Sequence, residues 1–277
     1  MLKDFKPTLW SARLIANLDK SLVFKNFVNT DYEGEIKAFG DSVVINQFGD
    51  ITVLPYTGAD IADPEDVTGS TQTLLIDQAQ YYNFKVKDLD AAQANIDLVD
   101  KAMERAAVAI ANVIDMSLAK LVTGAGATVG TLVAPTSITV SNAYDKLVDL
   151  GVKMTELNVP KAGRQIILPA WYIGLLSKDP RFTLNFTVLA NGVVEGATVG
   201  GFTLMESNNV LKDVTDPSIC QCPAGTKSAI SYAGQVTEIE PYRPQSNFSD
   251  AVKGLFAYGH KVVQPAALIN FIIKQGV

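Results

Sequence analysis

The sequence predicts an α+β protein in which an N-terminal arm and an extended β-hairpin loop precede a long spine helix and a central α+β domain. Three observations support this order. Strand patterns fill residues 35–87, apolar residues recur at helical spacing from Gln93 to Thr123, and helix and strand patterns alternate over residues 135–235. The chain has 277 residues, of which 48% are hydrophobic, so it can bury a sizeable core and is not disordered as a whole.

The first 34 residues are only weakly periodic. One short amphipathic helix is expected among them, because apolar side chains fall at steps of four at Trp10, Leu14, Leu18 and Leu22. The remainder of this segment is expected to be an arm that lies on another surface.

Residues 35–87 have the pattern of extended chain. Ser42–Phe48, a turn at Gly49 and Asp50, and Ile51–Leu54 predict a strand, a turn and a second strand. An exposed polar loop is expected at residues 57–66, followed by a long strand from Thr73 to Lys87. Because too few apolar residues alternate here to form a separate core, we expect the hairpin to rest on another chain.

The segment from Gln93 to Thr123 predicts one long helix. Its apolar residues recur at steps of three and four, Asp88 and Asp90 precede it, and Gly124 can close its C-terminus. At 1.5 Å per residue such a helix spans roughly 45 Å, which is longer than most globular helices. It is expected to be the spine of the molecule.

Residues 135–277 predict mixed structure. Ser141 is expected to cap a helix that runs to about Leu157, and a short helix is expected from Ala170 to Leu176. The expected strands and apolar runs are Gln165–Leu168, Phe202–Met205, Gln235–Arg243, Val252–Tyr258 and Ala266–Ile273.

Composition and charge exclude several classes of protein. The formal net charge of −6 argues against a surface built to grip nucleic acid. Charged residues make up 19% of the chain, below the usual share, which suggests large areas buried against partners. No secretory signal and no membrane-spanning segment are recognised, and Cys220 and Cys222 are expected to be reduced thiols.

Motifs that resemble catalytic or binding sites fail on their context. Gly124–Gly130 follows a helix instead of a strand, so it does not fit a dinucleotide loop, and Gly196–Gly201 lacks the lysine of a phosphate loop. The acidic residues Asp60, Asp63, Glu65 and Asp66 miss the spacing of a calcium loop. His260, the one histidine, is expected to be structural. We therefore expect no cofactor, no metal and no enzyme activity.

The order of these parts resembles the major capsid protein of tailed bacteriophages, of the Hong Kong 97 phage type. The resemblance covers nearly the whole chain and rests on the order of its segments more than on any one of them. Its N-terminal part includes WSARLIANL at Trp10–Leu18, DYEGEI at Asp31–Ile36 and GDSVVI at Gly40–Ile45. Its later part includes Val159–Arg164, Gly201–Asn209, Gln235–Arg243 and Gly259–Pro265.

The resemblance implies a structural subunit that self-assembles into hexamers and pentamers of an icosahedral shell enclosing double-stranded DNA. The implied regions are an arm (1–34), an extended loop (35–87), a peripheral domain with the spine helix (88–134), a central axial domain (135–235) and peripheral strands with the C-terminal return (236–277). The extended loop would lie over a neighbouring subunit. Contacts between subunits are expected at Trp10, Arg13, Phe48, Gly49, Asp50, Asp63, Glu65, Glu240 and Arg243.

The implied partners are further copies of the chain, a portal and a separate scaffolding protein, since Met1 stands almost directly before the arm. DNA would be enclosed without sequence-specific binding, no membrane partner is expected, and the shell would be assembled in the host cytoplasm and located in the virion. An encapsulin, a compartment shell of the same fold, is the nearest alternative. A cytoplasmic hydrolase using His260 is the alternative from another class, and a fibre or tail component is disfavoured by the spine helix.

Overall fold

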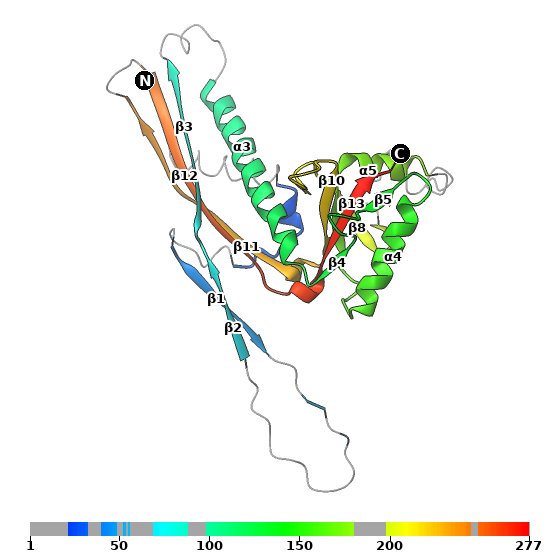
Figure 1. The fold of residues 1–277 in the computed structure, drawn as a ribbon. Helices are drawn as coiled ribbons and strands as arrows, with labels where there is room; N and C mark the ends of the chain where they lie inside the picture. The colour runs from blue at the N-terminus through cyan, green and yellow to red at the C-terminus, as the bar shows by residue number, and fades with distance from the viewer. Residues whose placement is uncertain are drawn as a thin grey trace.

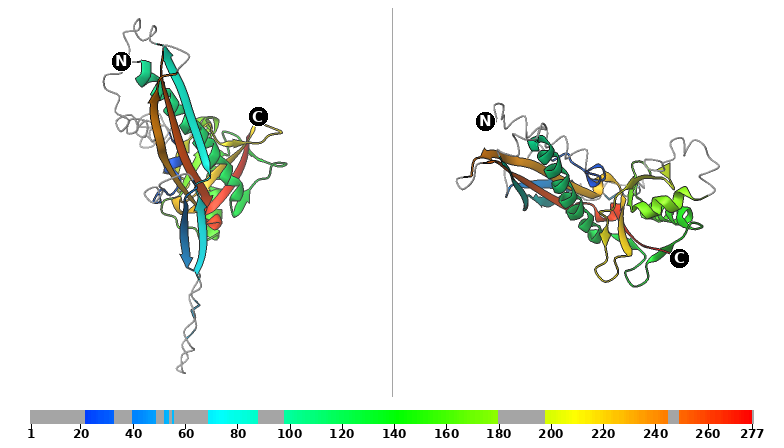
Figure 2. Two further views of the ribbon diagram at one scale, coloured as in Figure 1. Left: turned by 90° about the vertical axis from the view of Figure 1, so that its left-hand side faces the viewer. Right: turned by 90° about the horizontal axis from the view of Figure 1, so that it is seen from above.

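The structure is a computed structural model, and it describes residues 22–32, 40–48, 52–53, 55, 69–87, 98–179, 198–244 and 249–276. These residues form a compact body of helices and strands beside a long, narrow sheet, and a smaller hairpin projects from the lower end of that sheet (Figures 1 and 2). Helix α3 lies between the body and the long sheet (Figure 1). The arrangement agrees with the α+β class expected from the sequence.

Helix α3, Leu98–Lys120, continues as the 3-10 helix η3, Leu121–Gly124. The expected helix is therefore present over its described part, and its first residues, 93–97, lie outside the described residues. One stripe of the helix is buried, as the spacing predicts. Met103 and Ala107 pack with the long sheet, whereas Ile110, Ile114 and Leu118 belong to the main core. The helix thus joins the two parts of the fold.

The long sheet has three antiparallel strands in the order β11 (Ile230–Tyr242), β12 (Ser249–Val262) and β3 (Gln78–Lys87). Strand β12 is central and pairs with β3 over ten residues, from Ser249 with Lys87 to Tyr258 with Gln78. The long strand expected from Thr73 to Lys87 is interrupted at Ile76 and Asp77. At this break the Ile76 side chain is fully buried and its backbone N–H donates to the Asp41 carbonyl. The chain thereby passes from the hairpin into the long sheet.

The hairpin differs from the sequence prediction. Strand β1, Ser42–Phe48, has the expected bounds, but its partner is β2, Gly69–Leu75, in the register Ser42 with Leu75 to Phe48 with Gly69. The expected strand Ile51–Leu54 is wrong, since Thr52 and Val53 are outside any strand. The apparent two-residue turn at Gly49 and Asp50 was misleading because the pairing is set further along the chain.

The expectation that the hairpin rests wholly on another chain is also wrong at its base. Val43, Ile45, Leu74 and Ile76 form a small core with Ala233, Ala257 and Val263 of the same chain. These contacts hold the start of the hairpin against the long sheet, so the projecting part is tied to its own subunit.

The compact body is built on an eight-stranded sheet in the order β4-β13-β10-β6-β8-β7, with β5 beside β13 and β9 beside β10. Strand β10, Ile219–Gly225, was missed by the sequence analysis although all seven of its residues are buried. The other strands are β4 (Ala127–Val129), β5 (Thr136–Ile138), β6 (Gln165–Leu168), β7 (Thr198–Val199), β8 (Phe202–Glu206), β9 (Leu211–Lys212) and β13 (Leu268–Gln275).

Two helices pack on this sheet, α4 (Ala143–Glu156) and α5 (Ala170–Ser177). The residue that precedes α4 is Asn142, so the expected cap at Ser141 is wrong by one position. Asn142 accepts a hydrogen bond from the backbone N–H of Thr139 and donates to the Ser137 carbonyl. Its side chain therefore fixes the turn before the helix. Short 3-10 helices complete the fold at Phe24–Asn26 (η1), Lys227–Ala229 (η4) and Pro265–Ala267 (η5).

The segment Lys101–Gly124 is long and apolar enough to span a membrane, with a mean hydropathy of 1.5 over its most apolar stretch. No membrane-spanning segment was expected from the sequence, because its uninterrupted apolar runs are short. In the fold 44% of this stretch is buried against the rest of the chain. Its buried residues include Asp115, which accepts hydrogen bonds from backbone N–H groups. The helix is the core helix of this fold.

Candidate assembly surfaces

The long sheet has two faces of different character. One is covered by α3, whose Met103 and Ala107 pack with Ile239, Val252 and partly buried Tyr82. On the opposite face, which we call the outer face, antiparallel pairing sets Glu238, Leu255 and Tyr81 in one row across the three strands. The next row is Glu240, Lys253 and Asn83.

The chain itself covers the lower half of the outer face. Ala233 and Ala257 lie there beneath the base of the hairpin and are almost fully buried with Val43 and Leu74. Further along the strands the two rows just described are not covered by the described part of the hairpin, and Tyr81 is 80% exposed. The same sheet face is therefore core at one end and surface at the other.

The exposed rows are joined by polar contacts. The Lys253 ammonium lies 2.6 Å from a Glu240 carboxylate oxygen and 6.0 Å from the centre of the Tyr242 ring. The Tyr242 hydroxyl donates to Asn83 Oδ1 at 3.0 Å. The hydrogen bond from Lys253 lowers the pKa of Glu240, and the neighbouring Glu240 raises the pKa of Glu238. Two carboxylates thus share the field of one ammonium group.

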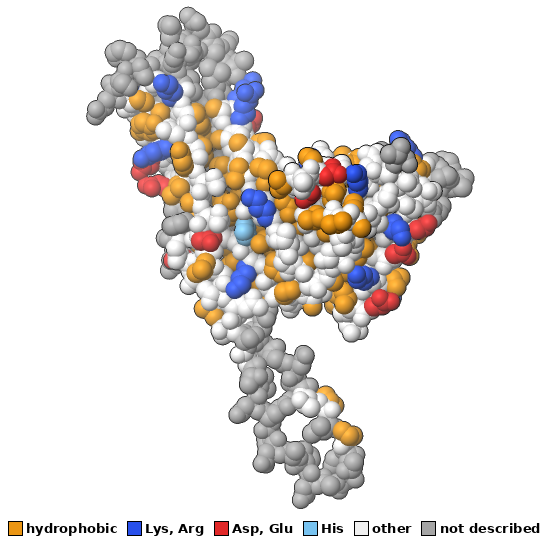
Figure 3. All heavy atoms as spheres, in the orientation of Figure 1, with side chains coloured by type: hydrophobic (Ala, Val, Ile, Leu, Met, Phe, Trp, Pro, Cys, Tyr) orange, Lys and Arg blue, Asp and Glu red, His pale blue; other side chains and the backbone are white. Residues whose placement is uncertain are grey.

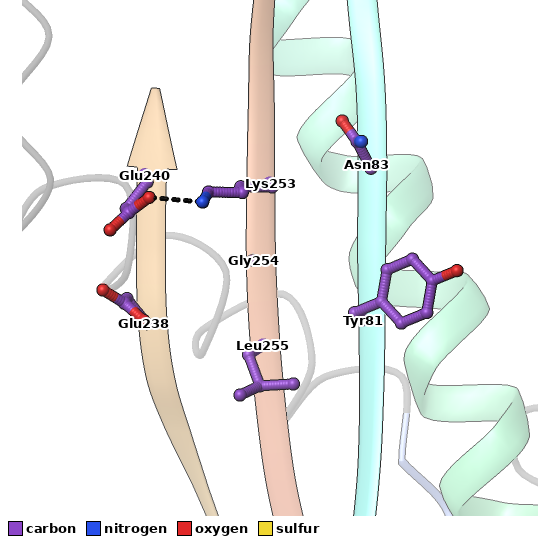
Figure 4. A pocket seen from close by; sticks show the side chains of 7 residues that line it. All are labelled: Tyr81, Asn83, Glu238, Glu240, Lys253, Gly254 and Leu255. Carbon is purple, nitrogen blue, oxygen red and sulfur yellow. Dashed lines mark ion pairs between the residues drawn. The ribbon is translucent and has the colours of Figure 1, made fainter. Parts of the chain in front are cut away.

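A hollow of about 290 Å³ opens between these rows, over the backbone of Gly254 (Figure 4). Figure 4 shows Glu238 and Glu240 on β11, Lys253 and Leu255 on β12, and Tyr81 and Asn83 on β3 around it. A Cβ atom on Gly254 would overlap the ring of Tyr82 on the covered face. The hollow therefore has a backbone floor, polar walls on one side and an aromatic ring on the other.

The structure describes three of the nine residues expected to contact other subunits. Glu240 and Arg243 are at the far end of β11, where Glu240 forms the ion pair with Lys253 and Arg243 is exposed just after the strand. Phe48 is the last residue of β1. The remaining residues, Trp10, Arg13, Gly49, Asp50, Asp63 and Glu65, lie outside the described residues.

A second exposed surface follows α3. Val108 and Met116 are each 47% exposed on the stripe of the helix that faces away from the core. Figure 3 views the molecule in the orientation of Figure 1 and shows hydrophobic side chains over much of this face, with charged side chains scattered between them. This composition agrees with the low overall share of charged residues.

Beneath this surface, Asp115 joins three parts of the chain. It is 2% exposed, and its two carboxylate oxygens accept hydrogen bonds from the backbone N–H groups of Val23 and Phe24, each at 3.3 Å. A further hydrogen bond comes from the Asn209 side chain of the compact body. Burial raises the pKa of Asp115 to about 6, because removing a carboxylate from water disfavours its charged form. This site fixes the beginning of the described chain to α3.

His260 on β12 contacts Ser117 on α3, with 2.7 Å between the ring Nε2 and the hydroxyl oxygen. Burial lowers the pKa of His260 below its ordinary value, so the neutral ring is favoured. Serine beside histidine is the pairing that a hydrolase would need. However, Ser117 lies inside α3, where its backbone N–H is used by the helix and does not point at a substrate. The contact joins the helix to the sheet.

A second hollow, of about 620 Å³, lies in the compact body between α4 and the turn at Gly200 and Gly201. At its edge the buried guanidinium of Arg164 donates to the carbonyls of Gly151, Val159 and Pro160. Burial lowers the pKa of Arg164. These bonds stabilise the end of α4, since carbonyl groups there lack partners within the helix.

The described residues lack the features of a metal or nucleotide site. No three His, Cys, Asp or Glu side chains come close enough within them to hold a metal ion. Gly124 ends the 3-10 helix η3, and a Cβ on Gly126 would press on the Pro265 carbonyl at 2.7 Å. Gly126 therefore allows the chain to pack closely against Pro265 after the end of the helix. The acidic stretch 60–66 lies outside the described residues.

Comparison with known proteins identifies the family that has this architecture. A family model described as phage capsid protein matches residues 71–270, which is most of the chain. The chain belongs to this phage capsid protein family. No curated protein sequence matches it.

Solved capsid structures agree with this family. A structure from Mycobacterium phage Che8 superposes on the capsid protein with a TM-score of 0.72 at 26% identity, covering 99% of this chain and 93% of the other. The capsid of cyanophage P-SCSP1u gives a TM-score of 0.71 at 14% identity, covering 100% and 91% of the two chains. The expected identification as a phage major capsid protein, a structural protein of the virion capsid, is confirmed.

The fold is not confined to phages. A virus-like particle from Pyrococcus furiosus matches with a TM-score of 0.58 at 12% identity, covering 97% of this chain and 99% of the other. At this identity the likeness shows the fold alone. The family match places this chain with the phage capsid proteins.

Proposed function

We propose that this capsid protein forms the hexamers and pentamers of an icosahedral shell around double-stranded DNA and carries out no catalysis. The observation that supports this most is the family match across residues 71–270, which spans the long sheet, α3 and most of the compact body. A closed shell needs the same contacts repeated by symmetry, and such permanent interfaces often bury 2,000 Å² or more in total.

The regions proposed from the sequence assign roles to these parts. The compact body, within residues 135–235, would meet its counterparts around each local symmetry axis. The loop within residues 35–87 and the arm of residues 1–34 would reach neighbouring subunits. The described structure qualifies the boundaries, because β3 pairs with β12 in the long sheet and β11 runs from Ile230 to Tyr242 across the boundary at 235.

Shell assembly is tested by expressing the full chain alone and together with its scaffolding protein, followed by negative-stain microscopy and light scattering. Closed particles of uniform diameter are expected when a scaffold is supplied. A chain that stays monomeric under both conditions would contradict the proposal. Nuclease-protected DNA in particles from infected cells supports a virion shell, whereas protein cargo without DNA supports an encapsulin.

The absence of catalysis has its own test. Ser117 and His260 form the described pair that most resembles hydrolytic machinery, at 2.7 Å. Purified capsid protein and its His260→Ala variant are compared against ester and peptide substrates. Equal background rates are expected. Turnover by the wild type that disappears in the variant would support the hydrolase alternative.

A further inference from the structure

The outer face of the long sheet is completed at one end only. The base of the hairpin covers Ala233 and Ala257, but the rows that contain Tyr81 and Lys253 extend beyond it. Tyr81 is 80% exposed, and the hollow of about 290 Å³ beside it is open to solvent. A subunit that assembles with copies of itself has a reason to keep such a surface, so the upper half of this face is a candidate docking surface.

The chemistry of the hollow favours a basic side chain. Its walls carry the carboxylates of Glu238 and Glu240 against the ammonium of Lys253, and that ammonium is bound to Glu240. The side-chain hydrogen bond with Glu240, together with repulsion from it, raises the pKa of Glu238, and a second cation beside the two carboxyl groups would offset this repulsion. Leu255 and Tyr81 in the same row offer apolar contact to the stem of a long side chain. An arginine fits both parts, because its guanidinium binds carboxylates in pairs and stacks on aromatic rings.

Two segments outside the described residues differ sharply in charge. Residues 1–21 contain Lys3, Lys6, Arg13 and Lys20 against Asp4 and Asp19, so this segment is net positive. Residues 49–68, which connect the two hairpin strands, contain five acidic residues and no Lys or Arg. The acidic connection would meet Glu238 and Glu240 with like charge, whereas the N-terminal segment complements them. It also holds Trp10 three residues before Arg13, an aromatic partner for the exposed ring of Tyr81.

The position of the described N-terminus favours a second copy as the donor. Val23 and Phe24 are bound to Asp115 on α3, which covers the opposite face of the long sheet. The described chain therefore begins on the side of the long sheet away from the hollow of the same subunit. Arg13 lies nine residues before Leu22, so at about 3.3–3.6 Å per extended residue it can lie up to roughly 30 Å from the described chain, which is enough to contact an adjacent copy.

From these observations we infer that the hollow between Glu238 and Glu240 of one copy binds the basic N-terminal segment of a second copy, with Arg13 between the two carboxylates. The inference rests on the proposed function, since it needs assembled copies. It adds to that function a residue-level contact that links Arg13 and Glu240 across the interface.

Charge exchange tests the pairing. Glu238→Lys and Arg13→Glu are each expected to raise the protein concentration needed for assembly by about threefold to tenfold, and the two changes together are expected to restore it in large part. Glu104→Lys, the same change at an exposed position of α3, is the matched control and should leave assembly unchanged. Two single variants that assemble like the wild type, or a double variant that is as poor as the worse single one, would overturn the inference.

A crosslink identifies the donor chain. Arg13→Cys combined with Glu238→Cys is treated with a short thiol crosslinker after assembly; Cys220 and Cys222 are 3% and 0% exposed and should not react. Products of two or more chains are expected, and crosslinking within one chain would overturn the inference. A second variant combines Asp63→Cys with Glu238→Cys. Crosslinking in this variant, and not in the one with Arg13→Cys, would assign the hollow to the acidic connection and would also overturn the inference.

The outcomes separate the two proposals. If the wild type forms shells but the variant with both Arg13→Cys and Glu238→Cys gives no crosslink between chains, this inference is refuted and the proposed shell function stands. A wild type that forms no shell with scaffold present refutes both the shell function and this inference, because no second copy then supplies the N-terminal segment.

Discussion

The compact body and the long sheet bury their side chains in different ways. In the body, β10 is buried at all seven positions, and β13 is buried at its first six. In the long sheet, Tyr82 and Phe84 of β3 pack toward α3. The residues that alternate with them, Tyr81, Asn83 and Lys85, are exposed. The body has covered both faces of its sheet within one chain. Among the described residues, one face of the long sheet is covered by α3 and only part of the other by the base of the hairpin.

The largest expected effect comes from placing a charge where the two regions join. Ile110→Asp puts a carboxylate at a position that is 5% exposed in the main core. Burial of an unpaired charge costs about 3–5 kcal/mol or more, which should prevent soluble folding. Soluble yield and circular dichroism measure the result. Val108→Asp, at a 47% exposed position on the same helix, is the matched control and should fold. A folded Ile110→Asp variant would show that the buried stripe of α3 is misassigned.

A methyl group at Gly259 should loosen the hairpin from the long sheet. A Cβ there would overlap the backbone carbonyl oxygen of Leu75. A backbone atom cannot move aside as the end of a flexible side chain can. Gly259→Ala is expected to cost about 1–3 kcal/mol in the free energy of unfolding, measured by denaturant titration. In contrast, a Cβ at Gly174 in α5 meets nothing within 4 Å, so Gly174→Ala should stabilise by about 0.5–1 kcal/mol. Equal effects at the two positions would argue against the seating of the hairpin.

Asp115 should give the attachment of the N-terminal residues a pH dependence. Its pKa is raised from 3.8 to about 6, so the folded state binds the proton more tightly than the unfolded chain does. The stability linked to this group is therefore full below about pH 4 and is lost as the pH rises to about 6, by up to about 3 kcal/mol. Asp115→Asn should flatten this part of the profile of melting temperature against pH. An unchanged slope in the variant would exclude Asp115 as its source.

His260 should act in the opposite direction and more weakly. Because burial lowers its pKa below the ordinary 6.5, the stability linked to the neutral ring is present above that value and is lost as the pH falls below it. His260→Gln should keep a hydrogen bond to Ser117 while removing the titration. The melting temperatures of the wild type and the variant are compared between about pH 5 and 7, a range that includes the ordinary pKa of histidine. If the difference in melting temperature between the wild type and His260→Gln does not change across this range, the assignment is contradicted.

The smallest expected effect on the subunit comes from deleting residues 57–69. The base of the hairpin is held by Val43, Ile45, Leu74 and Ile76, all outside the deletion. Thermal unfolding of the unassembled subunit should therefore change little, whereas the yield and melting of assembled particles should fall. Particles with normal yield and melting would contradict a role of the loop in assembly.

Local sequence patterns predicted the elements that can be recognised without knowing which other strand or helix they pack against. The bounds of Ser42–Phe48 and Gln165–Leu168 agree with the structure, and the spacing of apolar residues located α3. These segments have a strong period or a short apolar run, which are local properties. Strand β10 was missed because a fully buried strand need not alternate, and Pro223 in its middle disfavoured a strand.

The remaining differences depend on contacts between distant residues. The partner of β1 is β2 because Leu74 and Ile76 pack with Ala233 and Ala257, which no turn motif at Gly49 reveals. The contact between Ser117 and His260 joins residues 143 positions apart. The rows around Lys253 likewise need three strands in register. Of the nine residues expected at interfaces, Glu240 borders the proposed docking hollow, and its ion pair with Lys253 was not visible in the sequence.

The passage from β2 into β3 has a mechanical consequence. The two strands follow each other along the chain with only Ile76 and Asp77 between them, and β3 is paired with β12 over ten residues. A pull on the loop at the end of the hairpin therefore runs lengthwise along β3 and loads its hydrogen bonds to β12 together. Bonds loaded in parallel resist far more force than bonds opened one after another. The hairpin is thus anchored so that tension applied to it passes directly into the long sheet and its helix.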